Sequence, residues 1–193
     1  MRGLRDYTRS QKVVHWLMAL AIMLDLFVAQ KFGGVMKEWD RLESRSDHAT
    51  LGTVMAILFL VRLVLRWRHG APSLPSSMSP WQVRAAHWGH GLLYFFVGFL
   101  ILSGILTALS AAQPILVFGA FDITMAKAGS LLASAGSTFD DLRWFHEFAT
   151  NMVIALIVIH VTAAFYHWLI AKDETTQRML RFWSGSRTTE DSN

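Results

Sequence analysis

Histidine is the residue type best suited to chemistry in this sequence, and two of the eight histidines stand fourteen residues apart in one apolar stretch. The stretch HEFATNMVIALIVIH begins at His146 and ends at His160. In an α-helix, fourteen residues rise about 21 Å and return to within roughly 40° of the starting direction. Both imidazoles therefore face the same side of one helix, at two different depths.

The sequence limits what these histidines can do. It contains no cysteine, which excludes disulfides, thiolate metal sites and covalently attached c-type haem. Any metal must therefore be held by histidine, methionine or carboxylate ligands. A histidine inside a lipid bilayer is costly and rare, so each one is expected to have a partner or a water-filled cavity.

Four apolar stretches are long enough to cross a bilayer, at residues 13–31, 48–67, 85–110 and 146–170. Hydrophobic residues make up 53% of the sequence and the mean hydropathy is +0.34, as expected for a membrane protein. The first stretch lacks an A-x-A cleavage site, so we interpret it as a retained span and not as a signal peptide. The net charge of +4 does not indicate nucleic-acid binding, because the basic residues flank apolar stretches.

The distribution of Lys and Arg predicts the orientation of the spans. With both termini on one side of the membrane, twelve of these residues lie on that side and six on the other. Because basic residues are enriched in cytoplasmic loops, we expect both termini in the cytoplasm. The sequence shows no internal repeat, and we expect residues 1–193 to form one all-α domain, an antiparallel four-helix bundle in the membrane.

Two helix starts carry capping signals. Ser79, Pro80 and Gln82 are typical of the N-cap, N1 and N3 positions and predict the start of the third helix. Asp140 and Asp141 favour a helix start just before His146. The connection at residues 111–139 is predicted to be a long loop over the outer face, and loops of that length are often functional.

The antiparallel order fixes the depth of each histidine. His15 begins the first helix at the cytoplasmic side, and His160 reaches the same level. His48 and His146 begin the second and fourth helices at the outer side. Two facing imidazole pairs are what two six-coordinate haems b require, since each porphyrin supplies four nitrogens and a histidine on either face completes the iron. We therefore expect two haems b in the bundle core, with the ligand pairs His15/His160 and His48/His146.

Three further residues could contact a haem propionate or a quinone: His90, His167 and Arg84. His90 could also replace His15 as a ligand. For His167, a position at the membrane interface without a ligand is an equal alternative. Asp25 lies past the middle of the first span, where we expect snorkelling or local hydrogen bonding in place of a proton path.

The order of these features resembles the small bacterial di-haem cytochromes b of the b-561 type, which are related to the cytochrome b subunits of nickel–iron hydrogenase and formate dehydrogenase. The matching segments cover nearly the whole chain: HW at 15–16, HATLG at 48–52, VRLVLR at 61–66, GHGLLY at 89–94, and the stretch from FHEF at 145–148 to Met179. The resemblance implies haem ligation by the same two histidine pairs. It also implies electron transfer across the membrane and, in several members, a quinone.

One branch of this family is similar to superoxide oxidases, which pass an electron from periplasmic superoxide to ubiquinone. The segment VFGAFDI at 117–123 looks more like another branch. We therefore expect a bacterial inner-membrane protein that moves electrons between a periplasmic donor and the quinone pool, with a superoxide:ubiquinone oxidoreductase as one form. Two alternatives stay open: a haem-binding anchor subunit of a periplasmic redox enzyme, and a histidine-lined metal or proton transporter.

Overall fold

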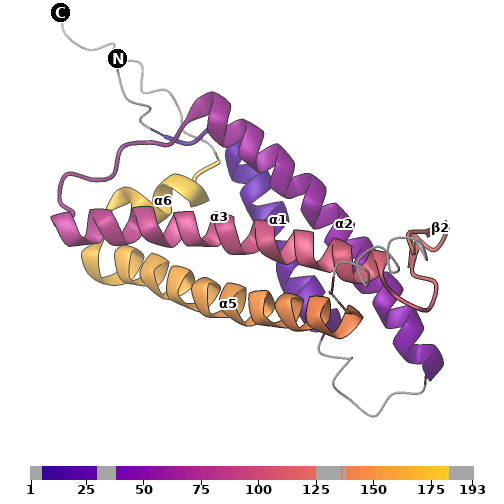
Figure 1. Ribbon diagram of the computed structural model, residues 1–193. Helices are drawn as coiled ribbons and strands as arrows, with labels where there is room; N and C mark the ends of the chain where they lie inside the picture. Colours follow the sequence, from indigo (N-terminus) through magenta and orange to yellow (C-terminus); the bar gives the residue numbers. More distant parts are fainter. Residues whose placement is uncertain (1–5, 30–37, 125–135, 137, 183–193) are drawn as a thin grey trace, which may run out of the picture.

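The computed structural model describes residues 6–29, 38–124, 136 and 138–182 (Figure 1). Four helices in these ranges are long and apolar enough to cross a membrane. They are α1 (Arg9–Ala29), α2 (Glu38–His69), α3 (Pro80–Leu109) and α5 (Phe139–Tyr166), which continues into the π-helical turn η2 (His167–Ala171). Figure 1 shows successive helices running in opposite directions along an elongated bundle, which confirms the predicted antiparallel four-helix fold.

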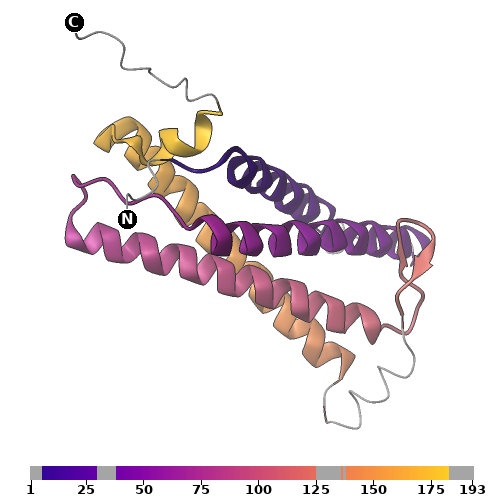
Figure 2. The ribbon, with the colours of Figure 1, turned by 90° about the horizontal axis from the view of Figure 1, so that it is seen from above.

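The four helices pack as two antiparallel pairs. Helix α1 packs mainly on α2 and α3 packs mainly on α5, while contacts between the two pairs are sparser (Figures 1 and 2). The core between the pairs is apolar and draws side chains from all four helices: Met18, Ile22, Met55, Phe59, Val97, Leu100, Ala149 and Val153. Polar groups that enter this core therefore need partners inside the protein.

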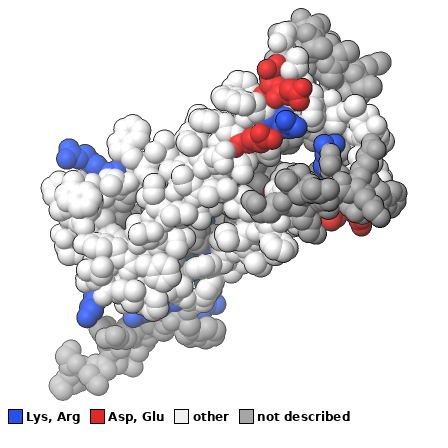
Figure 3. Space-filling model, turned by 90° about the horizontal axis from the view of Figure 1, so that it is seen from below, with Lys and Arg blue, Asp and Glu red and all other residues white. Residues whose placement is uncertain are grey.

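The outer surface between the two ends of the bundle is apolar as well. Large hydrophobic side chains on the outside of every long helix are exposed, among them Phe27, Leu60, Phe95 and Ile159. On the face in Figure 3, charged residues gather toward the two ends of the molecule and leave a broad uncharged zone between them. Exposed apolar surface of this extent is unfavourable in water and is covered by lipid in a membrane. The chain is an integral membrane protein.

The helices extend beyond the predicted apolar spans. The spans at 48–67 and 146–170 correspond to helices that begin earlier, at Glu38 and Phe139. The first span, at 13–31, corresponds to a helix that begins at Arg9, and its last two residues lie outside the described residues. Hydropathy marks only the part of a helix that lies in lipid, whereas backbone hydrogen bonding continues the helix into polar sequence.

Both predicted helix starts are confirmed. Ser79 precedes α3, Pro80 is its first residue, and Oε1 of Gln82 accepts a hydrogen bond from the Ser79 backbone N–H at 2.8 Å. Thr138 is the N-cap of α5, where its hydroxyl accepts from the Asp141 N–H (3.2 Å) and the Asp141 carboxylate accepts from the Thr138 N–H (2.9 Å). These bonds satisfy N–H groups that have no partner within the helix.

The connection predicted as a loop at 111–139 contains a short β-hairpin, in which β1 (Leu116–Val117) pairs antiparallel with β2 (Phe121–Asp122). Phe118 and Gly119 have positive φ angles and turn the chain between the strands. Strands of two residues are too short for alternation to be recognised in a sequence. Residues 125–135 and 137 of this connection lie outside the described residues.

The hairpin is fixed to α2 by side-chain hydrogen bonds. The Leu116 N–H donates to the Ser46 hydroxyl at 3.1 Å, and the Phe118 N–H donates to the Thr50 hydroxyl at 2.9 Å. We call this end of the bundle the hairpin end. The opposite end, which carries the short helix α6 (Glu174–Leu180), is called the α6 end.

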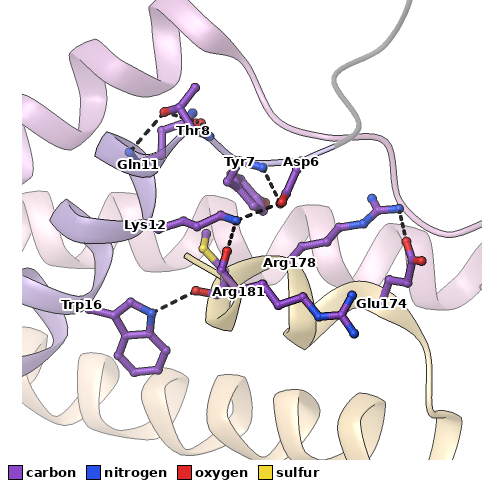
Figure 4. A network of polar contacts seen from close by, with 10 residues as sticks. Asp6, Tyr7, Thr8, Gln11, Lys12, Trp16, Glu174, Arg178 and Arg181 are labelled. Carbon is purple, nitrogen blue, oxygen red and sulfur yellow. Dashed lines mark hydrogen bonds and ion pairs between the residues drawn. The ribbon is translucent and has the colours of Figure 1, made fainter. Parts of the chain in front are cut away.

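A polar network joins the start of α1 to α6 at the α6 end (Figure 4). The Lys12 side chain is 3% exposed, and its Nζ donates to Oδ2 of Asp6 at 2.9 Å and to the Arg181 carbonyl at 2.6 Å. Nε1 of Trp16 donates to the Met179 carbonyl at 3.2 Å. Hydropathy does not predict α6, because its seven residues are mostly polar. The network fixes α6 against the start of α1 at this end of the bundle.

Replacing the buried Lys12 with alanine should destabilise the protein by about 1–3 kcal/mol, because the change removes the ammonium donor that the Arg181 carbonyl and Oδ2 of Asp6 share. Thermal unfolding of the purified protein in detergent measures the effect. Glu147→Gln is the matched control, because Glu147 pairs with Arg143 where both side chains are exposed, and such pairs contribute little. Equal unfolding midpoints for the two variants would contradict the role given to Lys12.

Candidate haem sites

Helix α5 brings its two histidines against other histidines at two levels of the bundle. His146 lies near the hairpin end, where its ring centroid is 5.8 Å from that of His48 on α2. His160 lies toward the α6 end, where its ring centroid is 6.3 Å from that of His15 on α1. The four side chains are all partly buried. The structure therefore brings together both pairs that the sequence predicts.

The hairpin-end pair, His48 and His146, is held by hydrogen bonds at Nδ1. Nδ1 of His48 lies 2.7 Å from Oδ1 of Asp25 on α1, so this carboxylate bonds to a neighbouring helix, whereas the sequence predicted snorkelling or local hydrogen bonding. Nδ1 of His146 lies 3.1 Å from the Leu100 carbonyl and 3.2 Å from the Ser103 hydroxyl on α3. With Nδ1 engaged in this way, both imidazoles would bind a metal through Nε2.

A glycine makes room for His146. A Cβ atom at Gly104 of α3 would lie 2.9 Å from Cε1 of His146, closer than real Cβ contacts come, and 3.2 Å from its Nδ1. The imidazole therefore lies against the bare backbone of α3. Sequence reasoning did not single out Gly104 or Ser103, although small residues in an apolar helix often mark a close contact with a neighbouring helix.

The α6-end pair, His15 and His160, has a third histidine beside it. The ring centroid of His90 on α3 is 5.5 Å from that of His160, and its Nδ1 lies 2.7 Å from the Ala86 carbonyl one turn earlier. Both partners predicted for His160 are thus within reach, and either could face it across a metal ion. The exchange of His90 for His15 as a ligand stays a prediction that an experiment can decide.

The geometry fits an iron between the two rings at each level. Two imidazoles that bind one metal ion from opposite sides, each nitrogen about 2.0 Å from it, have ring centroids about 6 Å apart. The spacings of 5.8 Å and 6.3 Å agree with that arrangement. No three His, Cys, Asp or Glu side chains among the described residues are placed to hold a bare metal ion, whereas two facing imidazoles suit an iron whose other four ligands come from a porphyrin.

His167 lies beyond the second level and contacts a carboxylate. Its Nδ1 is 2.5 Å from Oδ2 of Asp173, whose Oδ1 accepts the Thr175 N–H at 2.9 Å and so caps α6. Partial burial acts to raise the pKa of Asp173, but hydrogen bonds from Thr175 and His167 outweigh it and leave that pKa below its ordinary value. Asp173 therefore stays ionised at neutral pH and orients the His167 ring.

Arg84 lies on the second turn of α3, with its side chain exposed at the α6 end. The described part of the chain gives it no hydrogen bond or ion pair. Its predicted contact with a propionate or a quinone stays a prediction.

Comparison with known proteins decides the family. Residues 6–182 match the family model described as prokaryotic cytochrome b561. The chain belongs to this family. Cytochrome b561 homolog 2 of Escherichia coli K12 is 31% identical over 170 residues, which are 86% of each chain. "Probable superoxide oxidase CybB" of Yersinia pestis is 25% identical over 91% of this chain and 96% of its own, and cytochrome b562 of Cereibacter sphaeroides is 26% identical over 91% and 95%.

Membership of the prokaryotic cytochrome b561 family confirms the resemblance inferred from the sequence. A cytochrome b binds haem b and transfers electrons, so the chain is a haem b electron-transfer protein of a bacterial membrane. The four apolar helices and the paired histidines are the features of the structure that this role requires.

Gly104→Ala should weaken haem binding at the hairpin end by about tenfold or more, because the new methyl group displaces the His146 ring. Haem content and the reduced-minus-oxidised spectrum of the purified protein measure the loss. Gly91→Ala is the matched control on the same helix, since a Cβ atom there meets nothing within 4 Å. If Gly104→Ala retains the haem content and spectrum of the unmodified protein, His146 does not depend on this close approach.

Proposed function

We propose that this chain binds two haems b and carries electrons across the bacterial inner membrane, between a periplasmic donor and the quinone pool. In this proposal, one haem is held by His48 and His146 and the other by His15 and His160. When bound, each haem supplies a centre that accepts and releases one electron. The hairpin end would face the periplasm and both termini the cytoplasm, as the distribution of Lys and Arg predicts.

The observation that carries the proposal is one arrangement repeated at two levels of α5. At each level α5 supplies one imidazole, and a helix of the other pair supplies the second. The levels are about 21 Å apart along α5, which is most of the roughly 30 Å apolar thickness of a bilayer. Two redox centres at these levels would divide the crossing into shorter steps.

The residues around the ligands hold them in position and keep water away. Asp25 and the Leu100 carbonyl engage Nδ1 of the hairpin-end histidines, which fixes the tautomer and the direction of each ring. Between the two levels the core consists of apolar side chains, including Phe59 and Val153. Such a core provides the dry, low-dielectric surroundings in which an electron can cross without a proton.

We propose the α6 end as the quinone side. Because the ionised Asp173 accepts a hydrogen bond from Nδ1 of His167, Nε2 of the neutral ring would accept a hydrogen bond from a quinol hydroxyl. Two buried polar atoms on α6, Oγ1 of Thr175 and Nε of Arg178, have no hydrogen-bond partner among the described residues. They could bind a quinone oxygen or a propionate, and the same contacts are proposed for His90 and Arg84.

Superoxide is the donor that the name of one relative suggests. A relative that covers 91% of this chain is named a probable superoxide oxidase, although the identity is 25%. As a superoxide:ubiquinone oxidoreductase, the protein would take one electron from each of two superoxide ions. It would then reduce ubiquinone to ubiquinol with two protons taken up at the quinone side.

The alternative of an anchor subunit also has a structural observation in its favour. Phe118 and Phe121 of the β-hairpin are 57% and 68% exposed at the hairpin end, where a periplasmic redox enzyme could dock. Copurification from native membranes separates the two functions. A stoichiometric soluble redox partner would favour the anchor, and a protein that purifies alone with its haems would favour the independent carrier.

His160→Ala should remove the haem at the α6 end and leave the one at the hairpin end, because α5 contributes a separate ligand at each level. Extracted haem per protein should fall by about half, and replacement of one axial ligand typically abolishes tight binding. His15→Ala should behave in the same way, whereas His90→Ala should keep both haems. If His90→Ala loses a haem and His15→Ala does not, His90 is the ligand in place of His15.

Rapid mixing with superoxide and with ubiquinol tests the direction of electron flow. If the chain is a superoxide oxidase, superoxide should reduce the haem in the isolated protein near the diffusion limit, on the order of 10⁸ M⁻¹s⁻¹, and ubiquinol should form in steady state. Boiled protein and the His160→Ala variant are the controls. Reduction by ubiquinol alone, with no reaction with superoxide, would reject the oxidase and leave the electron carrier.

A further inference from the structure

Asp25 is a carboxylate inside the apolar bundle. Its surface is 7% exposed, and it lies on α1 at the level of the hairpin-end pair. Its Oδ1 is 2.7 Å from Nδ1 of His48 on the neighbouring helix α2. An ionisable side chain at this depth is costly in a membrane, so its presence indicates a function.

If His48 binds a metal through Nε2, only one assignment of donor and acceptor is possible in its contact with Asp25. A metal-binding imidazole is neutral, so the hydrogen resides on the nitrogen that does not face the metal. Nδ1 of His48 is then the donor, and the ionised Asp25 carboxylate is the acceptor. A protonated Asp25 would donate to Nδ1 and leave the hydrogen on Nε2, which would block the metal.

The other level carries a cation in place of a carboxylate. Arg62 follows His48 by fourteen residues on α2, so it lies on nearly the same face at the level of the α6-end pair. Its guanidinium lies over the Tyr94 ring, 5.7 Å from the centroid. A fixed positive charge at this level acts on the His15 and His160 pair. The two levels therefore have opposite charges beside their imidazole pairs.

We propose that Asp25 is a positioning residue that holds His48 through Nδ1 and lowers the reduction potential of the iron at the hairpin end. The inference rests on the proposed function, because it requires a haem at each level. A carboxylate hydrogen-bonded to the far nitrogen of a ligand imidazole makes that imidazole more basic. A more basic ligand and a nearby negative charge both favour oxidised iron, which carries one more positive charge than reduced iron.

The two opposite charges also favour one direction of electron flow. Arg62 favours reduced iron at the α6 end, while Asp25 favours oxidised iron at the hairpin end. An electron therefore moves to lower energy when it passes from the hairpin end to the α6 end. The fixed charges of the chain would then assist transfer from a periplasmic donor toward a quinone on the opposite side.

Potentiometric titration of Asp25→Asn tests the proposal in the full chain with haem bound. The asparagine oxygen still accepts the hydrogen bond, but the negative charge is gone. We expect the midpoint potential of the iron at the hairpin end to rise by at least about 59 mV. For one electron, this rise corresponds to about a tenfold shift from oxidised to reduced iron. The midpoint at the α6 end should stay near its original value. The His160→Ala chain identifies which midpoint belongs to the hairpin end.

Asp47→Asn is the matched control, because it removes the same charge from the exposed residue next to His48. A shift in Asp25→Asn that is absent, or no larger than the shift in Asp47→Asn, would overturn the proposal. Asp25→Ala removes the hydrogen bond as well, and should lower the affinity for the haem at the hairpin end by about 10–100-fold. Failure of the unmodified protein to bind two haems would reject the proposed function, which is a separate outcome.

If Asp25→Asn does not fold or bind haem, a measurement on the unmodified protein tests the proposal. Infrared difference spectra are recorded between the oxidised and reduced protein, with aspartate labelled by ¹³C at the carboxyl carbon. The potential is poised so that only the iron of lower midpoint changes its oxidation state. We expect a label-sensitive carboxylate band to shift. The absence of any labelled aspartate band in the difference spectrum would overturn the proposal.

Discussion

A histidine in the hydrocarbon of a membrane must find its partner within the protein, because lipid offers no hydrogen bonds or metal ligands. In this bundle α5 meets α2 through one histidine pair and α1 through another. These contacts join the two helix pairs where their direct packing is sparser. An iron held between the imidazoles at each level would therefore connect the two halves of the fold, so that the structure depends on the same cofactor as the function.

The short elements at the two ends are fixed beside histidines that we propose bind haem or a quinone. The β-hairpin bonds to Ser46 and Thr50, which lie two residues before and after His48 on α2. At the opposite end, Asp173 caps α6 and also engages the ring of His167. Each end of the bundle thus places a short element next to one histidine level, where a donor or a quinone would approach in the proposed function.

Much of this arrangement follows from the sequence, because helix periodicity and antiparallel order fix the depth and face of His146 and His160. The rotation of α1 and α3 about their own axes does not follow, since both helices are apolar on nearly every side. For that reason the contact between Asp25 and His48, and the close approach of His146 to Gly104, appear only in the structure. Because the sequence does not fix this rotation, it cannot decide whether His15 or His90 is the partner of His160. In the structure both rings lie beside it.

The central claim is that each chain holds two iron porphyrins between histidine pairs at two levels of the bundle. Its most direct test is the ratio of extracted haem to protein in the full chain, purified in mild detergent after expression with an ample supply of haem. Pyridine extraction identifies the haem type, and amino-acid analysis measures the protein. We expect haem b at a ratio of two per chain; a ratio of one, or no haem at all, would contradict the claim.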